Sequence, residues 1–77
     1  MNVKELENEL ERLGISKNLY SIMQGGFLNE KLCLVHEDEW KIYYSERGKR
    51  TGEKEYSSEA EACETFLRKV KRYADRK

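Results

Sequence analysis

The chain has 77 residues, 38% of them hydrophobic and 39% charged, and its 15 basic and 15 acidic side chains give a formal net charge of zero. This length gives room for one domain, 1–77, whose small core argues against an enzyme with a deep, dry pocket. Zero net charge argues against a general binder of nucleic acid or of membranes, because both need a surplus of Lys and Arg. The first residues lack the apolar stretch of a secretory signal, and the longest apolar run, Leu32–Val35, is far short of the ~20 residues of a membrane span. We therefore expect a cytoplasmic protein.

Residues 3–13 have the pattern of an amphipathic helix. Asn2 and Glu5 have the spacing of a capping box, and Gly14 is suited to a left-handed stop after the last turn. The apolar stripe that would face the core consists of Val3, Leu6, Leu10 and Leu13.

Residues 16–31 have no clear period. Ser16 is placed to cap a short turn, and residues 20–23 have the composition of a short edge strand. Gly25 and Gly26 predict a turn or a loop. Two alternatives, a sheet of three strands or of four, stay open at this point.

Residues 32–36 and 40–46 are rich in β-branched, aromatic and other apolar side chains and predict two strands. A polar turn at 47–52 then leads to a third strand at about 51–57, which pairs back onto the second. The three strands would form an antiparallel meander with one packed face and one wet face. The tight turn between the first two strands is acidic: Glu37, Asp38 and Glu39.

Alternation along 40–46 decides which side chains face the core. One set is expected to point to the packed face: Trp40, Ile42 and Tyr44. The residues between them point the other way, so Tyr43 is expected on the open face, where a partner could contact it.

The last helix is the clearest element. Ser58 and Glu61 have the spacing of a capping box, and a basic stretch at the C-terminus suits the helix dipole. The apolar positions recur with the helical period: Ala60, Cys63, Phe66, Leu67, Val70, Tyr73 and Ala74. The expected fold class is α+β in the order α-β-β-β-α, with the antiparallel sheet packed on the N- and C-terminal helices.

The neutral total hides blocks of charge. Residues 41–54 carry five basic and two acidic side chains, net +3, whereas 55–67 carry four acidic and no basic ones, net −4. Residues 68–77 carry six basic and one acidic side chain, net +5. Helix-end electrostatics accounts for much of this pattern in the last helix, but it requires neither the acidic turn at 37–39 nor the basic turn at 47–54. Both turns are open to two interpretations, solvated loop tips or contact surfaces.

The residue types of a catalytic or metal site are sparse. Cys33 and Cys63 lie within apolar patterns and predict two reduced core residues. The single His, His36, is three residues from Cys33 in a strand, so the two side chains would point to opposite faces. We therefore expect no enzyme, no cofactor and no metal.

One binding alternative is nucleic acid. Double-stranded-RNA-binding domains share the order α-β-β-β-α and grip phosphates with a Lys-rich start of the second helix. Here that helix begins with Ser58-Glu59-Ala60-Glu61, which would repel phosphate. A small nucleic-acid-binding regulatory protein, using the basic turn 47–54 and the C-terminal tail, stays as the alternative.

The other binding alternative rests on a family resemblance. Residues Trp40–Gly48 resemble a motif of small bacterial immunity proteins of polymorphic toxin and contact-dependent growth inhibition systems, W-x-V/I-Y-Y-S-E-R-G. In that family a polar turn and a Ser/Glu-rich start of a last helix containing Ala-Cys follow, as in Ser57–Glu64 here. The N-terminal helix ending in Leu13-Gly14-Ile15 also fits.

The resemblance implies a cytosolic protein that binds the C-terminal domain of one cognate toxin, often a nuclease, and blocks it by stoichiometric binding. A toxin that binds RNA or DNA is usually basic at that surface, so acidic side chains would suit the inhibitor. Glu46 and Arg47 have two interpretations, a structural ion pair at the end of the strand or contact residues. The candidate partner-binding residues are Glu37, Asp38, Glu39, Tyr43, Glu46 and Arg47.

Overall fold

The computed structural model of the protein describes residues 1–23 and 30–75. The elements in chain order are α1 (Val3–Arg12), β1 (Tyr20–Ile22), β2 (Lys31–His36), β3 (Trp40–Glu46), β4 (Lys49–Tyr56) and α2 (Glu59–Asp75). The expected α+β class, with helices at both ends of the chain packed on a sheet, is confirmed. Gly25 and Gly26 lie outside the described residues, so the turn expected there stays a prediction.

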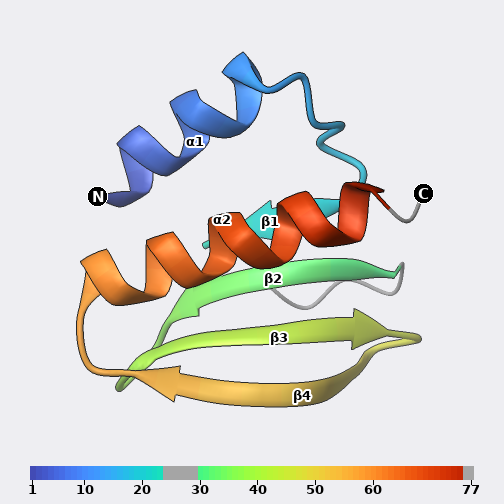
Figure 1. Ribbon diagram of the computed structural model, residues 1–77. Helices are drawn as coiled ribbons and strands as arrows, with labels where there is room; N and C mark the ends of the chain where they lie inside the picture. Colours follow the sequence, from blue (N-terminus) through green and yellow to red (C-terminus); the bar gives the residue numbers. More distant parts are fainter. Residues whose placement is uncertain (24–29, 76–77) are drawn as a thin grey trace.

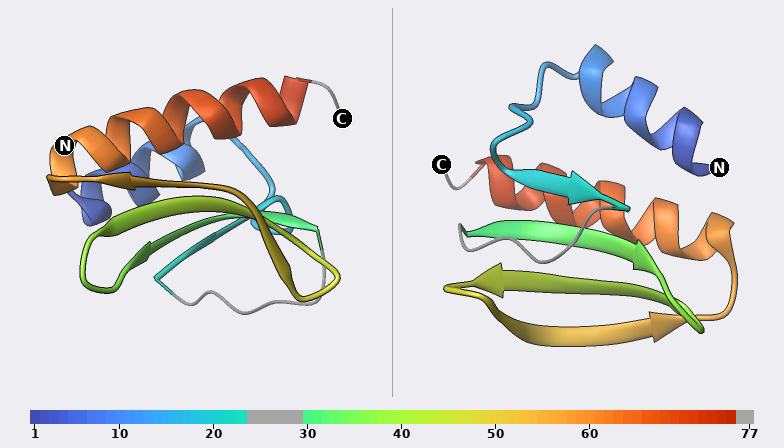
Figure 2. Two further views of the ribbon diagram at one scale, coloured as in Figure 1. Left: turned by 90° about the horizontal axis from the view of Figure 1, so that it is seen from below. Right: turned by 180° about the vertical axis from the view of Figure 1, so that it is seen from behind.

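The sheet has four strands in the order β1-β2-β3-β4. Strands β2, β3 and β4 form the expected antiparallel meander. The short strand expected at 20–23 is present as β1 at the edge, but it runs parallel to β2, so the sheet is mixed. Both helices lie on one side of the sheet, with α2 across it and α1 beside α2 toward the β1 edge (Figures 1 and 2).

Local chemistry caps both ends of α1 and the start of α2. Asn2 and Glu5 form the complete capping box of α1, because the Asn2 side chain accepts from the Glu5 N–H and the Glu5 side chain accepts from the Asn2 N–H. Gly14 follows α1 with φ +71°, which confirms the left-handed stop. Ser58 accepts a hydrogen bond from the Glu61 N–H at 3.2 Å, so one half of the predicted capping box of α2 is confirmed. The reciprocal bond from the Ser58 N–H to the Glu61 side chain is not among the hydrogen bonds of the described residues. No helix in the described ranges is long and apolar enough to cross a membrane.

The β3–β4 connection is shorter than the sequence suggests. Only Arg47 and Gly48 lie between the strands, with φ of 52° and 81°, which is the pattern of a two-residue type I′ turn. The strand expected to begin at about 51 therefore begins at Lys49. The twist of this turn matches the twist of paired strands, so pairing continues directly to the turn.

A β-bulge in β4 changes which side chains share a face. Tyr44 pairs with Thr51 and Ile42 pairs with Lys54, so Tyr43 alone opposes two residues, Gly52 and Glu53. Gly52 has φ +63°, the left-handed conformation that a glycine adopts at the first position of such a bulge. The extra residue reverses the inward and outward alternation of side chains in the part of β4 that follows the bulge.

The main core lies between the helices and the sheet. Its fully or nearly buried residues come from α1, α2 and the inner face of the strands: Leu6, Leu10, Tyr20, Leu34, Ile42, Ala62, Cys63, Phe66 and Val70. Trp40 packs against this core, as expected, but is only partly buried. Tyr44 is also half-buried, and its ring meets that of Tyr73 from α2 edge-on with 5.8 Å between ring centroids.

A second, smaller cluster covers the other face of the sheet and consists of Cys33, Val35 and Tyr43. Tyr43 is on the face that alternation predicts, but the expectation that it is open there is wrong, because the residue is only 1% exposed. Arg50 from β4 lies over its ring, with the guanidinium carbon 4.4 Å from the ring centroid. The pairing of β4, which local sequence does not specify, thus helps to bury this aromatic side chain.

Candidate functional site

The outer face of the sheet, opposite the helices, carries a network of ion pairs. Glu37 accepts two hydrogen bonds from the guanidinium of Arg50, at 3.2 and 3.0 Å. The Lys41 ammonium lies 3.3 Å from Glu37 and 3.8 Å from Glu55, and Arg50 lies 3.2 Å from Glu53. The network ties the β2–β3 turn to β3 and β4.

The network favours the charged form of its members. The hydrogen bonds from Arg50 and then from Lys41 hold the pKa of Glu37 below its ordinary value. The hydrogen bonds to Glu37 and Glu53 raise the pKa of Arg50, and the bond to Glu37 raises that of Lys41. Because these side chains are partly exposed, solvent screens each pair, and a single pair contributes little to stability. Glu37 therefore has a structural role on this face.

The bulge at Gly52 is what allows this network to form. In a regular strand, Arg50 and Glu53 would point to opposite faces, since side chains alternate. With one extra residue between them, Arg50 and Glu55 oppose Ser45 and Lys41 on the outer face, and Glu53 reaches the same guanidinium. Residue spacing in the sequence does not reveal this arrangement.

Asp38 and Glu39 differ from Glu37. Both are exposed, and neither side chain makes a hydrogen bond or an ion pair within residues 1–23 and 30–75. Figure 1 shows that their turn and the start of α2 lie at the same end of the sheet. Glu61, in the first turn of α2, is also exposed and has no side-chain partner among these residues. We call these three residues, Asp38, Glu39 and Glu61, the acidic end.

The six predicted contact residues do not form one site. The acidic turn precedes β3, whereas Glu46 is the last residue of β3 and Arg47 follows it. The length of the seven-residue strand therefore separates the two groups, roughly 20 Å at about 3.3 Å per residue. Glu46 and Arg47 are both exposed, and no ion pair joins them in the described part of the chain. The interpretation as a structural pair therefore has no support, and Tyr43 is buried beneath Arg50.

The cysteine and histidine side chains are placed as the alternation predicts. Cys33 lies in the outer cluster with Tyr43, whereas His36 stacks on Trp40 with ring centroids 4.2 Å apart and planes at 1°. Cys63 lies in the main core, where burial raises the pKa of its thiol to about 11. Burial also raises the pKa of the Cys33 thiol. Within the described ranges, no group of three or more His, Cys, Asp or Glu side chains could hold a metal ion.

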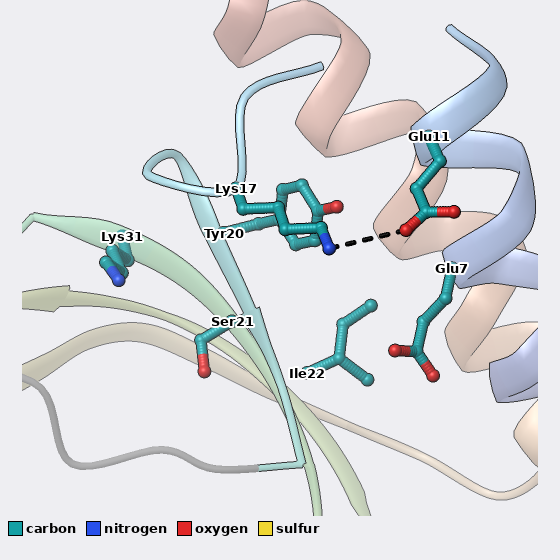
Figure 3. Close-up of a pocket in the computed structure, with 7 residues that line it drawn as sticks. All are labelled: Glu7, Glu11, Lys17, Tyr20, Ser21, Ile22 and Lys31. Carbon is teal, nitrogen blue, oxygen red and sulfur yellow. Dashed lines mark ion pairs between the residues drawn. The ribbon is translucent and has the colours of Figure 1, made fainter. Parts of the chain in front are cut away.

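A polar groove of about 270 Å³ lies between α1 and the edge strand β1 (Figure 3). Glu7 and Glu11 lie on successive turns of α1 and both line the groove. The Lys17 ammonium lies 3.3 Å from the Glu11 carboxylate. The apolar wall comes from Tyr20 and Ile22. The sequence pattern did not single out this groove, because α1 and β1 come together only in the folded chain.

The sequence also missed the charged residues of β4. Arg50 lies in the turn expected at 47–52, and Glu53 lies in the strand expected at about 51–57. The sequence assigns neither side chain an ion-pair partner. The pair Arg47-Gly48 was the available signal, because a two-residue loop with glycine second is typical of a type I′ hairpin. Pairing outward from that turn would have placed Arg50 opposite Ser45.

Comparison of the chain with protein-family models, with curated proteins and with solved structures finds no match.

Proposed function

We propose that this protein is an immunity protein that binds a cognate toxin domain, a nuclease, and neutralises it by stoichiometric contact. The observation that carries the proposal is the acidic end. Asp38 and Glu39 from the β2–β3 turn lie at the same end of the molecule as the acidic start of α2, and no residue of the described chain neutralises them. The motif resemblance of Trp40–Gly48 supports the family.

The chemistry of the acidic end suits such a partner. A nuclease presents Lys and Arg where it holds phosphates, and carboxylates on an inhibitor compete for that surface. Complementary charge also speeds the encounter and makes it sensitive to salt. The partner would meet the inhibitor in the cytoplasm, where nucleic acid is exposed to the toxin.

We assign a smaller set of residues to this contact than the sequence suggests. Asp38 and Glu39 remain proposed contact residues, joined by Glu61. Glu37 is engaged by Arg50 and Lys41, so its loss would alter the stability of the outer face as well as the charge of the turn. Tyr43 is buried and is therefore not a proposed contact residue.

The test is a calorimetric titration of the purified protein with the C-terminal domain of the toxin encoded beside its gene. The variant is Asp38→Lys with Glu39→Lys, and the matched control is Glu46→Lys with Asp75→Lys, which makes the same change in net charge at the other end of the molecule. We expect the first pair to weaken binding at least tenfold and the control pair to leave it nearly unchanged. Both variants should keep the melting temperature, since none of the four side chains has a partner in the described structure.

Two results would overturn this proposal. If the wild-type protein neither binds the adjoining toxin domain nor protects cells that express it, the protein is no immunity protein for that toxin. If the control pair loses affinity and the acidic-end pair does not, the contact lies at the Arg47 hairpin.

A further inference from the structure

The last turns of α2 meet the sheet through a pair of tyrosine side chains. Tyr44 lies in β3, and Tyr73 lies 29 residues later in α2. Their rings meet edge-on, with 5.8 Å between the ring centroids and 69° between the ring planes. Figure 1 shows that the end of β3 and the C-terminal turns of α2 lie at the same end of the molecule. The fold thus brings together two phenols that are distant in the sequence.

The two rings converge toward their hydroxyl groups. The phenol oxygen atoms of Tyr44 and Tyr73 are 3.5 Å apart, which is shorter than the distance between the ring centroids. The ortho carbons, which are the ring carbons beside the hydroxyl-bearing carbon, therefore lie near the place where the rings approach each other. Coupling of two tyrosines to dityrosine forms a bond between ortho carbons, so the pair is already oriented for this reaction.

Regular elements hold both residues in place. The Tyr44 backbone is paired with Leu32 in β2 on one side and with Thr51 in β4 on the other. The Thr51 hydroxyl also donates a hydrogen bond to the Tyr44 carbonyl oxygen at 3.1 Å. On the helix, Val70 lies one turn before Tyr73 and is fully buried in the main core. The approach of the two rings therefore does not depend on the conformation of a loop.

An oxidant can reach this pair more readily than the buried tyrosines. Tyr44 and Tyr73 are both partly exposed. Tyr20 and Tyr43, by contrast, have exposed fractions of only 8% and 1%. The hydrogen bond with Tyr73 raises the pKa of Tyr44, and burial adds to the rise, so the Tyr44 phenol carries its proton at neutral pH. Its oxidation must therefore remove a proton together with an electron.

We propose that Tyr44 and Tyr73 form an oxidative modification site, at which a peroxidase and hydrogen peroxide convert the pair into an intramolecular dityrosine. Each phenol loses one electron and its hydroxyl proton, and the two phenoxyl radicals form one carbon–carbon bond between ortho positions. The hydrogen atom on each bonded carbon then moves to the oxygen of its ring, which restores both aromatic rings. Hydrogen peroxide accepts the two electrons and the two protons and leaves as two water molecules.

The new bond would tie the C-terminal turns of α2 to β3. Residues 44 and 73 could then no longer separate in the unfolded chain, and a cross-link of this kind stabilises the folded state as a disulfide does. The oxidised protein should therefore melt at a higher temperature than the unmodified protein. The modification is independent of the proposed inhibitor function, since it requires no toxin partner.

The test treats the purified protein with a haem peroxidase and hydrogen peroxide, and it measures dityrosine fluorescence and the intact mass of the monomer. We expect a fluorescent monomer whose mass is lower by two hydrogen atoms, and a peptide map in which the peptides of Tyr44 and Tyr73 are joined. Tyr44→Phe and Tyr73→Phe should each lose both signals, because Phe forms no phenoxyl radical. Tyr56→Phe is the matched control, since it removes the phenol of another partly exposed tyrosine and should keep the wild-type yield.

The proposal is overturned if the wild-type monomer gains no dityrosine fluorescence, or if the fluorescence is confined to covalently linked dimers. Retention of the wild-type yield by Tyr44→Phe or Tyr73→Phe would also overturn it, as would an equal loss in Tyr56→Phe. The peptide map of the wild-type protein tests the pair without any substitution, so it stands even where a Phe variant is less stable. A map that joins Tyr44 or Tyr73 to a different tyrosine would contradict the assignment.

Discussion

Arg50 lies over the ring of Tyr43, with its guanidinium carbon 4.4 Å from the ring centroid, and its nitrogen atoms bond to Glu37 and Glu53. One side chain thus covers an aromatic ring and also bonds to two carboxylates. The arrangement converts the outer face of the sheet, which has no helix on it, into a second small core.

Replacing Arg50 by Ala should lower the free energy of unfolding by about 1–2 kcal/mol, from the lost cation–π contact and the exposed ion pairs together. Urea denaturation followed by Trp40 fluorescence measures this. Lys49→Ala is the matched control, because Lys49 is the neighbouring residue on the opposite face. An Arg50 variant as stable as the Lys49 variant would show that the contact with Tyr43 contributes nothing.

Gly52→Ala should cost about 1–2 kcal/mol, because a Cβ is disfavoured in the left-handed conformation. No heavy atom lies within 4 Å of the Cβ that would be added, so the cost comes from the backbone and not from a clash. Gly52→Asn should recover part of the loss, since Asn adopts this conformation more readily. Urea denaturation midpoints of the Gly52→Ala and Gly52→Asn variants measure this difference. Equal losses for Ala and Asn would contradict a conformational cause.

The stability of the protein should depend on Glu37 in acid. The pKa of Glu37 is lower in the folded protein than its ordinary value of 4.5. The unfolded chain therefore binds a proton first as the pH falls, and the contribution of Glu37, fully present above its unfolded pKa, is lost as the pH passes down through its folded pKa. Glu37→Gln should flatten the loss of melting temperature between pH 5 and pH 3 in thermal melts. Glu39→Gln, which removes an unpaired carboxylate of the same turn, should leave the wild-type profile.

Arg47 occupies a turn position that favours Asn or Gly, because its φ is 52°. Arg47→Asn should therefore raise the free energy of unfolding by a few tenths to about 1 kcal/mol. Thermal melting of the variant beside Lys49→Asn, which changes a neighbouring strand residue, separates the turn effect from a change in charge. A lower melting temperature for Arg47→Asn would mean that the Arg side chain stabilises the hairpin through a contact of its own.

Much of the secondary structure could be predicted because its signals are local. The capping box of Asn2 and Glu5 and the left-handed Gly14 act over three or four residues, and the structure confirms both. The exposure of Tyr43 could not be predicted in the same way, because it depends on Arg50 in the next strand. The roles of the candidate site residues also depend on contacts between strands. Glu37 and Asp38 are adjacent in sequence, but of these two side chains only that of Glu37 forms ion pairs in the described structure.

The sequence by itself determined most of the elements, their approximate bounds and which side of β3 faces the helices, because these follow from periodicity and caps within a few residues. Only the tertiary structure decided the parallel direction of β1 and the sorting of charge on β4. A bulge of one residue at Gly52 moves Glu53 to the face of Arg50 and leaves Lys54 beside the helices. The chain has an even mixture of 15 basic and 15 acidic side chains, and it folds with paired charges on the outer face of the sheet and unpaired ones at the acidic end. Pairing between strands, and not composition, sets that distribution.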